Sequence, residues 1–117
     1  MIKEEYVSFE TAKLLKEKGF NQVTIDSYRA NGQLRGEYKS CNYPCPTQQM
    51  ACRWLREVHG LFISIGNDDL DYNWQIFDVK NRTEDLDPTC LTESYAGYKT
   101  YEEAVEVAIK YCLENLI

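Results

Sequence analysis

The apolar residues of the chain recur at helical spacing in three segments, 8–18, 47–59 and 100–116. Within each segment the intervals of three and four residues place the apolar positions on one side of a helical wheel. They are Ala12, Leu14 and Leu15 in the first segment, Met50, Ala51, Trp54, Leu55 and Val58 in the second, and Tyr101, Ala104, Val105, Ala108, Ile109, Cys112 and Leu116 in the third. The pattern therefore predicts three amphipathic helices.

The ends of these predicted helices carry capping residues. Ser8, Thr47 and Thr100 stand at the N-cap positions, where a hydroxyl oxygen accepts a hydrogen bond from a free backbone N–H group. Gly19 and Gly60 follow the first two segments and suit the left-handed position that ends a helix. The capping residues thus agree with the boundaries that the apolar pattern predicts.

A pair of strands is predicted between the first two helices. Residues 22–29 alternate apolar and polar side chains, and the Asn31-Gly32 pair that follows is a favourable hairpin turn. The turn predicts a short partner strand over residues 34–38, which we expect at an edge of the sheet. Residues 39–46 hold two prolines and two cysteines and predict a loop.

A second pair of strands is predicted between the last two helices. Residues 61–65 and 72–80 are rich in branched and aromatic side chains and flank a polar turn at 67–71. Residues 91–98 predict one further strand. The resulting order, α-β-β-α-β-β-(β)-α, predicts an α+β fold with a small antiparallel sheet and three helices, in a single globular domain over residues 1–117.

The charge of the chain is concentrated in its second half. The net charge is −6, and residues 60–117 hold twelve of the 19 acidic residues but only four of the 13 basic ones. Such a surface repels phosphate, so nucleic-acid binding is disfavoured. The helix face that carries Arg53 and Arg56 leaves nucleic-acid binding as a weaker alternative.

The sequence gives two indications of cellular location. No apolar run reaches the ~18 residues that a membrane span needs, and the N-terminus lacks the apolar region of a secretion signal. The chain holds five cysteines, and an odd number without such a signal is typical of free thiols in a reducing compartment. We therefore expect a cytoplasmic protein with no membrane partner.

Four residues resemble a zinc-ligand set: Cys41, Cys45, Cys52 and His59. Cys52 and His59 lie two helical turns apart, a rise of about 10.5 Å, whereas tetrahedral ligands lie within ~4 Å of each other. The same separation argues against a catalytic Cys–His pair. We expect no metal, cofactor or catalytic residues, but a metal-binding or thiol-dependent protein that uses Cys41, Cys45 and Cys52 is the main alternative function.

Three segments together resemble a known family. They read VSFETAKLLKEKGF, PTQQMACRWLREVHGLFISI and TYEEAVEVAIKYCLENLI. They are similar to a family of short uncharacterised proteins of gut bacteria of the Bacteroides group, of phage or mobile-element origin. The resemblance implies a bacterial or phage setting, and it implies no catalytic or binding residues.

The chain is rich in amphipathic aromatic residues, with nine tyrosines and two tryptophans. Such residues are enriched at protein interfaces, and helices on one face of a small sheet leave its other face uncovered. We therefore expect a non-enzymatic protein-interaction or accessory protein, with an unknown protein partner and a weak homodimer. The residues expected on the interaction surface are Tyr28, Tyr38, Tyr72, Trp74, Arg53 and Arg56.

Overall fold

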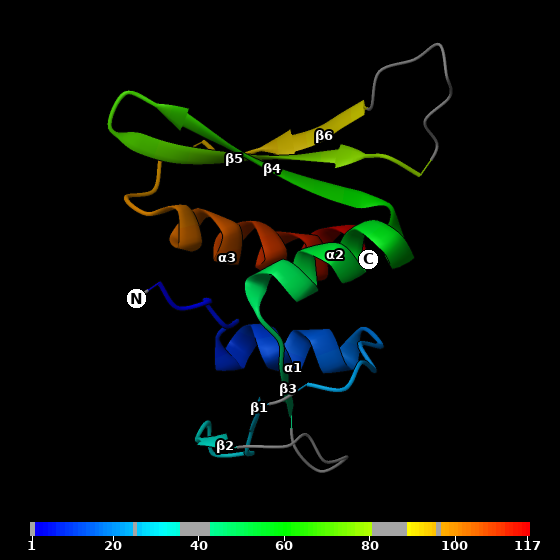
Figure 1. Ribbon diagram of the computed structural model, residues 1–117. Helices are drawn as coiled ribbons and strands as arrows, with labels where there is room; N and C mark the ends of the chain where they lie inside the picture. Colours follow the sequence, from blue (N-terminus) through cyan, green and yellow to red (C-terminus); the bar gives the residue numbers. More distant parts are fainter. Residues whose placement is uncertain (1, 25, 36–42, 81–88, 96) are drawn as a thin grey trace.

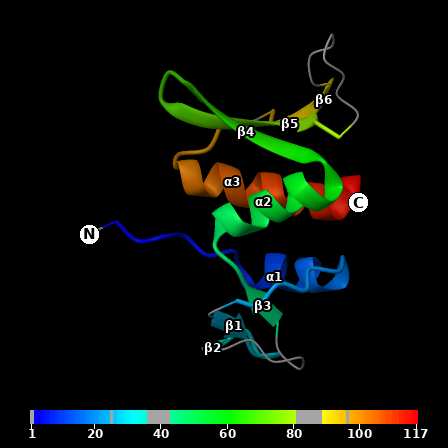
Figure 2. The same cartoon turned by 45° about the vertical axis from the view of Figure 1, so that its right-hand side comes forward.

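The helices and strands of the protein are stacked in tiers (Figure 1). The computed structural model describes residues 2–24, 26–35, 43–80, 89–95 and 97–117. A three-stranded sheet forms one end of the molecule, two helices pack beneath it, a third helix follows, and a second three-stranded sheet closes the other end. Figure 2 shows the same order of tiers from a second direction.

The order of the elements is that of an α+β fold. They are, in chain order, α1 (Phe9–Glu17), β1 (Asp26–Tyr28), β2 (Leu34–Arg35), β3 (Tyr43–Cys45), α2 (Gln48–His59), β4 (Leu61–Asp68), β5 (Asp71–Asp78), β6 (Thr89–Glu93), α3 (Tyr101–Tyr111) and a π-helical turn, η1 (Cys112–Leu116). This order confirms the predicted fold class, with three helices and antiparallel strands. The strands form two sheets instead of one, with the orders β2-β1-β3 and β4-β5-β6.

The larger sheet is built on a hairpin. β4 and β5 are eight-residue strands that pair along their whole length. The polar turn predicted between them is present, and its residue Asp69 adopts a left-handed backbone with φ 49°, a conformation that Asp tolerates in tight turns. β6 (Thr89–Glu93) joins the other side of β5, so the strand predicted over residues 91–98 begins two residues earlier and ends at Glu93.

The smaller sheet is described over two or three residues of each strand. β1 and β2 form the hairpin predicted at Asn31-Gly32, where Gly32 has φ 87°. β3 pairs with the opposite side of β1. The prediction of a loop over residues 39–46 is wrong at residues 43–45, because this strand is defined by its pairing with β1 and has no alternating pattern of its own.

One cluster of buried apolar side chains connects the three helices with the larger sheet. α2 and α3 cover one face of β4 and β5, and α1 packs against α3 and η1. Leu15, Leu55, Ile76 and Ile109 are fully buried members of the cluster. Cys112 is also fully buried, as its position on the predicted apolar face indicated.

The capping residues act as the sequence predicts. The hydroxyl oxygens of Ser8, Thr47 and Thr100 each accept a hydrogen bond from the backbone N–H three residues later, at 3.2, 3.1 and 3.1 Å. Gly60 ends α2 in the left-handed conformation, with φ 68°. The local sequence therefore determines where these helices begin and where α2 turns into β4.

The predicted buried faces of two helices are wrong in part. Met50 and Val58 of α2 are 40% and 50% exposed, and Tyr101 of α3 is 50% exposed. Conversely, Gln48 is buried, although it is polar. The buried arc of α2 is narrow because this helix packs against β4 and α3 at the margin of the sheet.

The last predicted helix changes its hydrogen-bonding pattern near its end. α3 ends at Tyr111, and residues 112–116 form the π-helical turn η1. The wider turn keeps Cys112 and Leu113 in the core, so the apolar face continues past the change in pattern. Within the described ranges, every helix is too short or too polar to cross a membrane.

Candidate functional site: a groove along the free edge of β4

β4 is an edge strand of the larger sheet. Its one neighbour in that sheet is β5, and in the part of the chain that the structure describes no strand pairs with its other side, which we call the free edge. β4 is eight residues long and begins with the apolar run Leu-Phe-Ile-Ser-Ile. Long apolar edges are the places where sheets accept an additional strand.

The pairing pattern identifies the backbone groups at the free edge. The backbone N–H of Val79 donates to the carbonyl of Gly60 at 2.9 Å, so Gly60 belongs to a hydrogen-bonded pair. Such pairs alternate along an antiparallel ladder. The N–H and C=O groups of Ile63 and Ile65 therefore point away from β5, towards the free edge.

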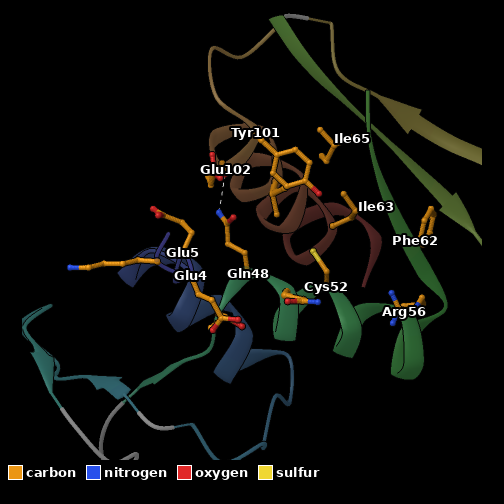
Figure 3. Close-up of a pocket in the computed structure, with 14 residues that line it drawn as sticks. Glu4, Glu5, Gln48, Cys52, Arg56, Phe62, Ile63, Ile65, Tyr101 and Glu102 are labelled. Carbon is orange, nitrogen blue, oxygen red and sulfur yellow. Dashed lines mark hydrogen bonds between the residues drawn. The ribbon is translucent and has the colours of Figure 1, made fainter. Parts of the chain in front are cut away.

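A groove with a volume of about 480 Å³ runs beside this edge (Figure 3). We call it the β4 groove; it lies between β4, α2, the start of α3 and the N-terminal segment. Its apolar lining is formed by Phe62, Ile63, Ile65, Tyr101 and Val105. The volume is within the range of about 300–1,000 Å³ that is common for binding sites, and polar and charged residues complete the lining.

The two ends of the β4 groove carry opposite charge. Glu4, Glu5 and Glu102 lie at one end, together with Lys3, which precedes Glu4, and Arg56 lies at the other end (Figure 3). The acidic side chains outnumber the basic one at the first end. The side chain of Arg56 is exposed and comes from the last turn of α2. The groove is therefore polarised along the direction of β4.

The polar wall of the groove is fixed by hydrogen bonds. The side-chain amide of Gln48 donates to the backbone carbonyl of Glu102 at 2.8 Å and to the carboxylate of Glu106 at 3.4 Å. The backbone N–H of Gln48 donates to the carbonyl of Glu5 at 2.8 Å. The buried amide thus ties the start of α2 to α3 and to the N-terminal segment, so its hydrogen-bonding capacity is used within the fold.

The thiol chemistry predicted as an alternative has little support in the geometry. Cys52 lines the β4 groove, and burial raises the pKa of its thiol to about 11. Burial likewise raises the pKa of Cys112 to about 12, and Cys45 is buried in β3. The thiolate is the reactive form, so Cys52 and Cys112 are unreactive near neutral pH.

The predicted zinc-ligand residues are spread over different elements. Cys41 lies outside the described residues, Cys45 is in β3, and Cys52 and His59 are on α2. Among the described residues, no three His, Cys, Asp or Glu side chains are grouped so that they hold a metal ion. His59 instead packs against Trp54, with 4.8 Å between the ring centroids.

The structure does not bring the predicted aromatic interaction residues together on one exposed face. Trp74 is only 4% exposed and packs against Tyr111, with 5.3 Å between the ring centroids. Tyr28 lies in the smaller sheet and Tyr72 in the larger one, at opposite ends of the molecule. Tyr38 lies outside the described residues. Tyr72 and Trp74 of β5 face α3, where their rings lie near those of Tyr101 and Tyr111.

Arg53 and Arg56 are both exposed, as predicted, but they have different neighbours. Arg53 forms an ion pair with Glu57 at 2.9 Å on the surface of α2. Arg56 lines the β4 groove. Of the predicted interaction residues, Arg56 is thus the one that lies in the candidate site.

The sequence indicates only one part of the groove, the strand that forms its edge. Residues 61–65 identify a strand, but no pattern identifies that strand as an edge, because edge position depends on which strands pair. Likewise, Gln48 and Glu102 are 54 positions apart, and nothing in the sequence relates them. The chain matches no family model, no curated protein and no solved structure.

Proposed function

We propose that the chain is a non-enzymatic protein-interaction protein that adds an extended strand of a partner polypeptide to the free edge of β4. One observation carries the proposal: the backbone groups of Ile63 and Ile65 face away from β5, beside a groove that has apolar side chains at its centre. Strand addition obtains affinity from backbone hydrogen bonds and specificity from pockets for alternate side chains. The free edge and the β4 groove supply these two requirements.

The alternation of side chains supports the same mode of binding. Ile63 and Ile65 pack against the core on the helix side of the sheet. A strand paired with them places every second side chain on that side, where the β4 groove is open. The partner segment is therefore expected to alternate apolar residues with exposed ones.

The ionisable and polar side chains of the groove favour binding over catalysis. The raised pKa of Cys52 keeps its thiol protonated near neutral pH, and the amide of Gln48 is committed to α3. The carboxylates at one end, Glu4, Glu5 and Glu102, are available to attract a basic residue. We therefore expect a partner that places a basic side chain at this end of the groove, either in the added strand or beside it.

A selection from a library of displayed extended peptides tests this proposal. Peptides that the chain enriches should alternate apolar residues and include Lys or Arg. A proline at the free edge, Ile65→Pro, removes an outward N–H without breaking the β4–β5 ladder and should weaken their binding about tenfold or more. Because Ile65 also packs on the core, Asn67→Pro serves as a second edge variant at an exposed position.

The matched control is Glu93→Pro, on the opposite edge of the same sheet. It should leave peptide binding unchanged, and circular dichroism should show native folding in all three variants. Failure to enrich any peptide would contradict the proposal. Equal binding by the wild type and both β4 edge variants would also contradict it.

A further inference from the structure

The free edge of β4 has a basic end and an acidic end. Near its first residue lies Arg56, in the last turn of α2. Its last residue, Asp68, belongs to the hairpin turn, together with Asp69 and Asp71. The charge therefore changes sign along the eight residues of the strand.

The β4 groove repeats this polarity on the helix side of the sheet. Arg56 lies at the end near Phe62, and Glu4, Glu5 and Glu102 lie at the opposite end (Figure 3). The edge and the groove thus have the same direction of charge. A ligand that fits both needs a negative end, an apolar centre and a positive end, arranged antiparallel to β4.

A second copy of β4 has this arrangement. We infer that the strand added to the free edge is β4 of another copy of this chain, paired antiparallel about a two-fold axis; this inference rests on the function proposed above. A two-fold interface uses the same surface of both chains. Each acidic turn then lies beside the basic end of the other copy, so the charges match twice.

The side chains of β4 are compatible with such a pair. In such a pair, residues whose backbone groups point to the free edge form hydrogen-bonded pairs with residues of the same kind in the other copy. Ile63 and Ile65 of one copy therefore lie opposite residues of this kind. Their side chains share the helix side of the sheet, where each copy contributes apolar groups to the other's groove. β4 contains neither Lys nor Pro, the residues that commonly prevent edge pairing.

The net charge of the chain opposes self-association and limits the affinity of the dimer. Each chain carries −6, and two such chains repel one another at long range. Salt screens this repulsion beyond about 8 Å at physiological ionic strength, whereas the opposite charges at the ends of β4 meet at contact distance. The inference is therefore a weak dimer, which is populated at micromolar concentration and above.

Sedimentation of the full chain over a range of concentrations tests the inference. The mass should rise from that of one chain, 13.7 kDa, to twice that value. Arg56→Glu makes both ends of the edge acidic and should raise the dimer dissociation constant about tenfold or more. Arg53→Glu is the matched control: it makes the same charge change on the same exposed helix, outside the groove, and should leave the dissociation constant within about twofold.

Mixing two charge variants tests whether association depends on the charges at the two ends of the groove. The Arg56→Glu chain has an acidic edge, and a Glu4→Lys/Glu5→Lys/Glu102→Lys chain has a groove that is basic at both ends. Each variant alone should be monomeric at concentrations where the wild type dimerises. A mixture of the two should form a heterodimer.

The outcomes separate this inference from the function on which it rests. A chain that stays monomeric at every concentration overturns the second-copy inference. Peptide binding that Ile65→Pro abolishes would still support strand addition in that case. Equal effects of Arg53→Glu and Arg56→Glu, or a mixture that forms no heterodimer, would also overturn the inference. If the wild-type chain neither self-associates nor binds any peptide, both proposals are contradicted.

Discussion

The two sheets of this protein differ in how their edges are protected. The smaller sheet is bounded by β2, described at Leu34–Arg35, and by β3, which contains Pro44 and is followed by Pro46. Proline is a common means of preventing a sheet edge from pairing with another chain. The larger sheet is bounded on one side by β4, which has eight residues and contains no proline. This difference indicates where the molecule can accept a strand.

The two sheets also differ in what stabilises them. The larger sheet rests on a continuous hairpin ladder and on side chains of β5 that enter the core. The smaller sheet relies on individual side-chain contacts: the Tyr28 hydroxyl donates to the carbonyl of Val7 at 2.7 Å, and the ring of Phe9 lies 5.6 Å from those of Tyr28 and Tyr43. We therefore expect single substitutions to have larger effects in the larger sheet.

The largest effect is expected at Trp74, where β5 meets α3. Trp74→Ala removes a buried indole that packs against Tyr111 and should lower the free energy of unfolding by about 3–5 kcal/mol. Urea titration measures this loss. Gln75→Ala, on the opposite face of the same strand, should change stability by less than about 0.5 kcal/mol. A loss below about 1 kcal/mol for Trp74→Ala would show that the larger sheet does not depend on this contact.

A smaller effect is expected in the smaller sheet. Tyr28→Phe removes the hydroxyl that donates to Val7 and should cost about 0.5–1.5 kcal/mol of unfolding free energy. Tyr95→Phe is the matched control, because Tyr95 is fully exposed and the same chemical change there should have no measurable effect. Equal stabilities of the Tyr28→Phe protein and the wild type would contradict a structural role for this hydrogen bond.

The smallest expected effect is a pH dependence of stability that arises from His59, in the last turn of α2. Burial, with a further contribution from Lys80, lowers the pKa of His59 below its ordinary value of 6.5. The unfolded chain therefore binds a proton more readily than the folded chain. Stability should be unaffected above about pH 7.5 and should fall as the pH decreases through about 6.5 towards the lower folded pKa.

Thermal unfolding between about pH 7.5 and about pH 5.5 measures this dependence. His59 is the one histidine in the chain, so His59→Gln should flatten the change in Tm across this window. The lowered pKa of Glu10, which results from its hydrogen bond and ion pair with Lys110, affects stability only at more acidic pH. An unchanged slope in the His59→Gln protein would show that His59 is not the source.

Local sequence predicted the elements of this fold well where a single segment contains all the necessary information. The helix starts follow from Ser8, Thr47 and Thr100, because a capping hydroxyl bonds to a backbone N–H only three residues away. The hairpin turns follow from short polar segments for the same reason. Of the candidate site, the sequence provided the strand at 61–65 and the exposed Arg56.

Tertiary structure decided the division of the strands into two sheets and the position of β4 at an edge. It also buried Trp74 against α3, where the pattern of the strand alone was compatible with an exposed face. These features depend on which elements pack together, and the energies of such contacts are shared between residues far apart in the chain. The amide of Gln48, bonded to the carbonyl of Glu102 across 54 positions, closes one wall of the groove through a contact of this kind.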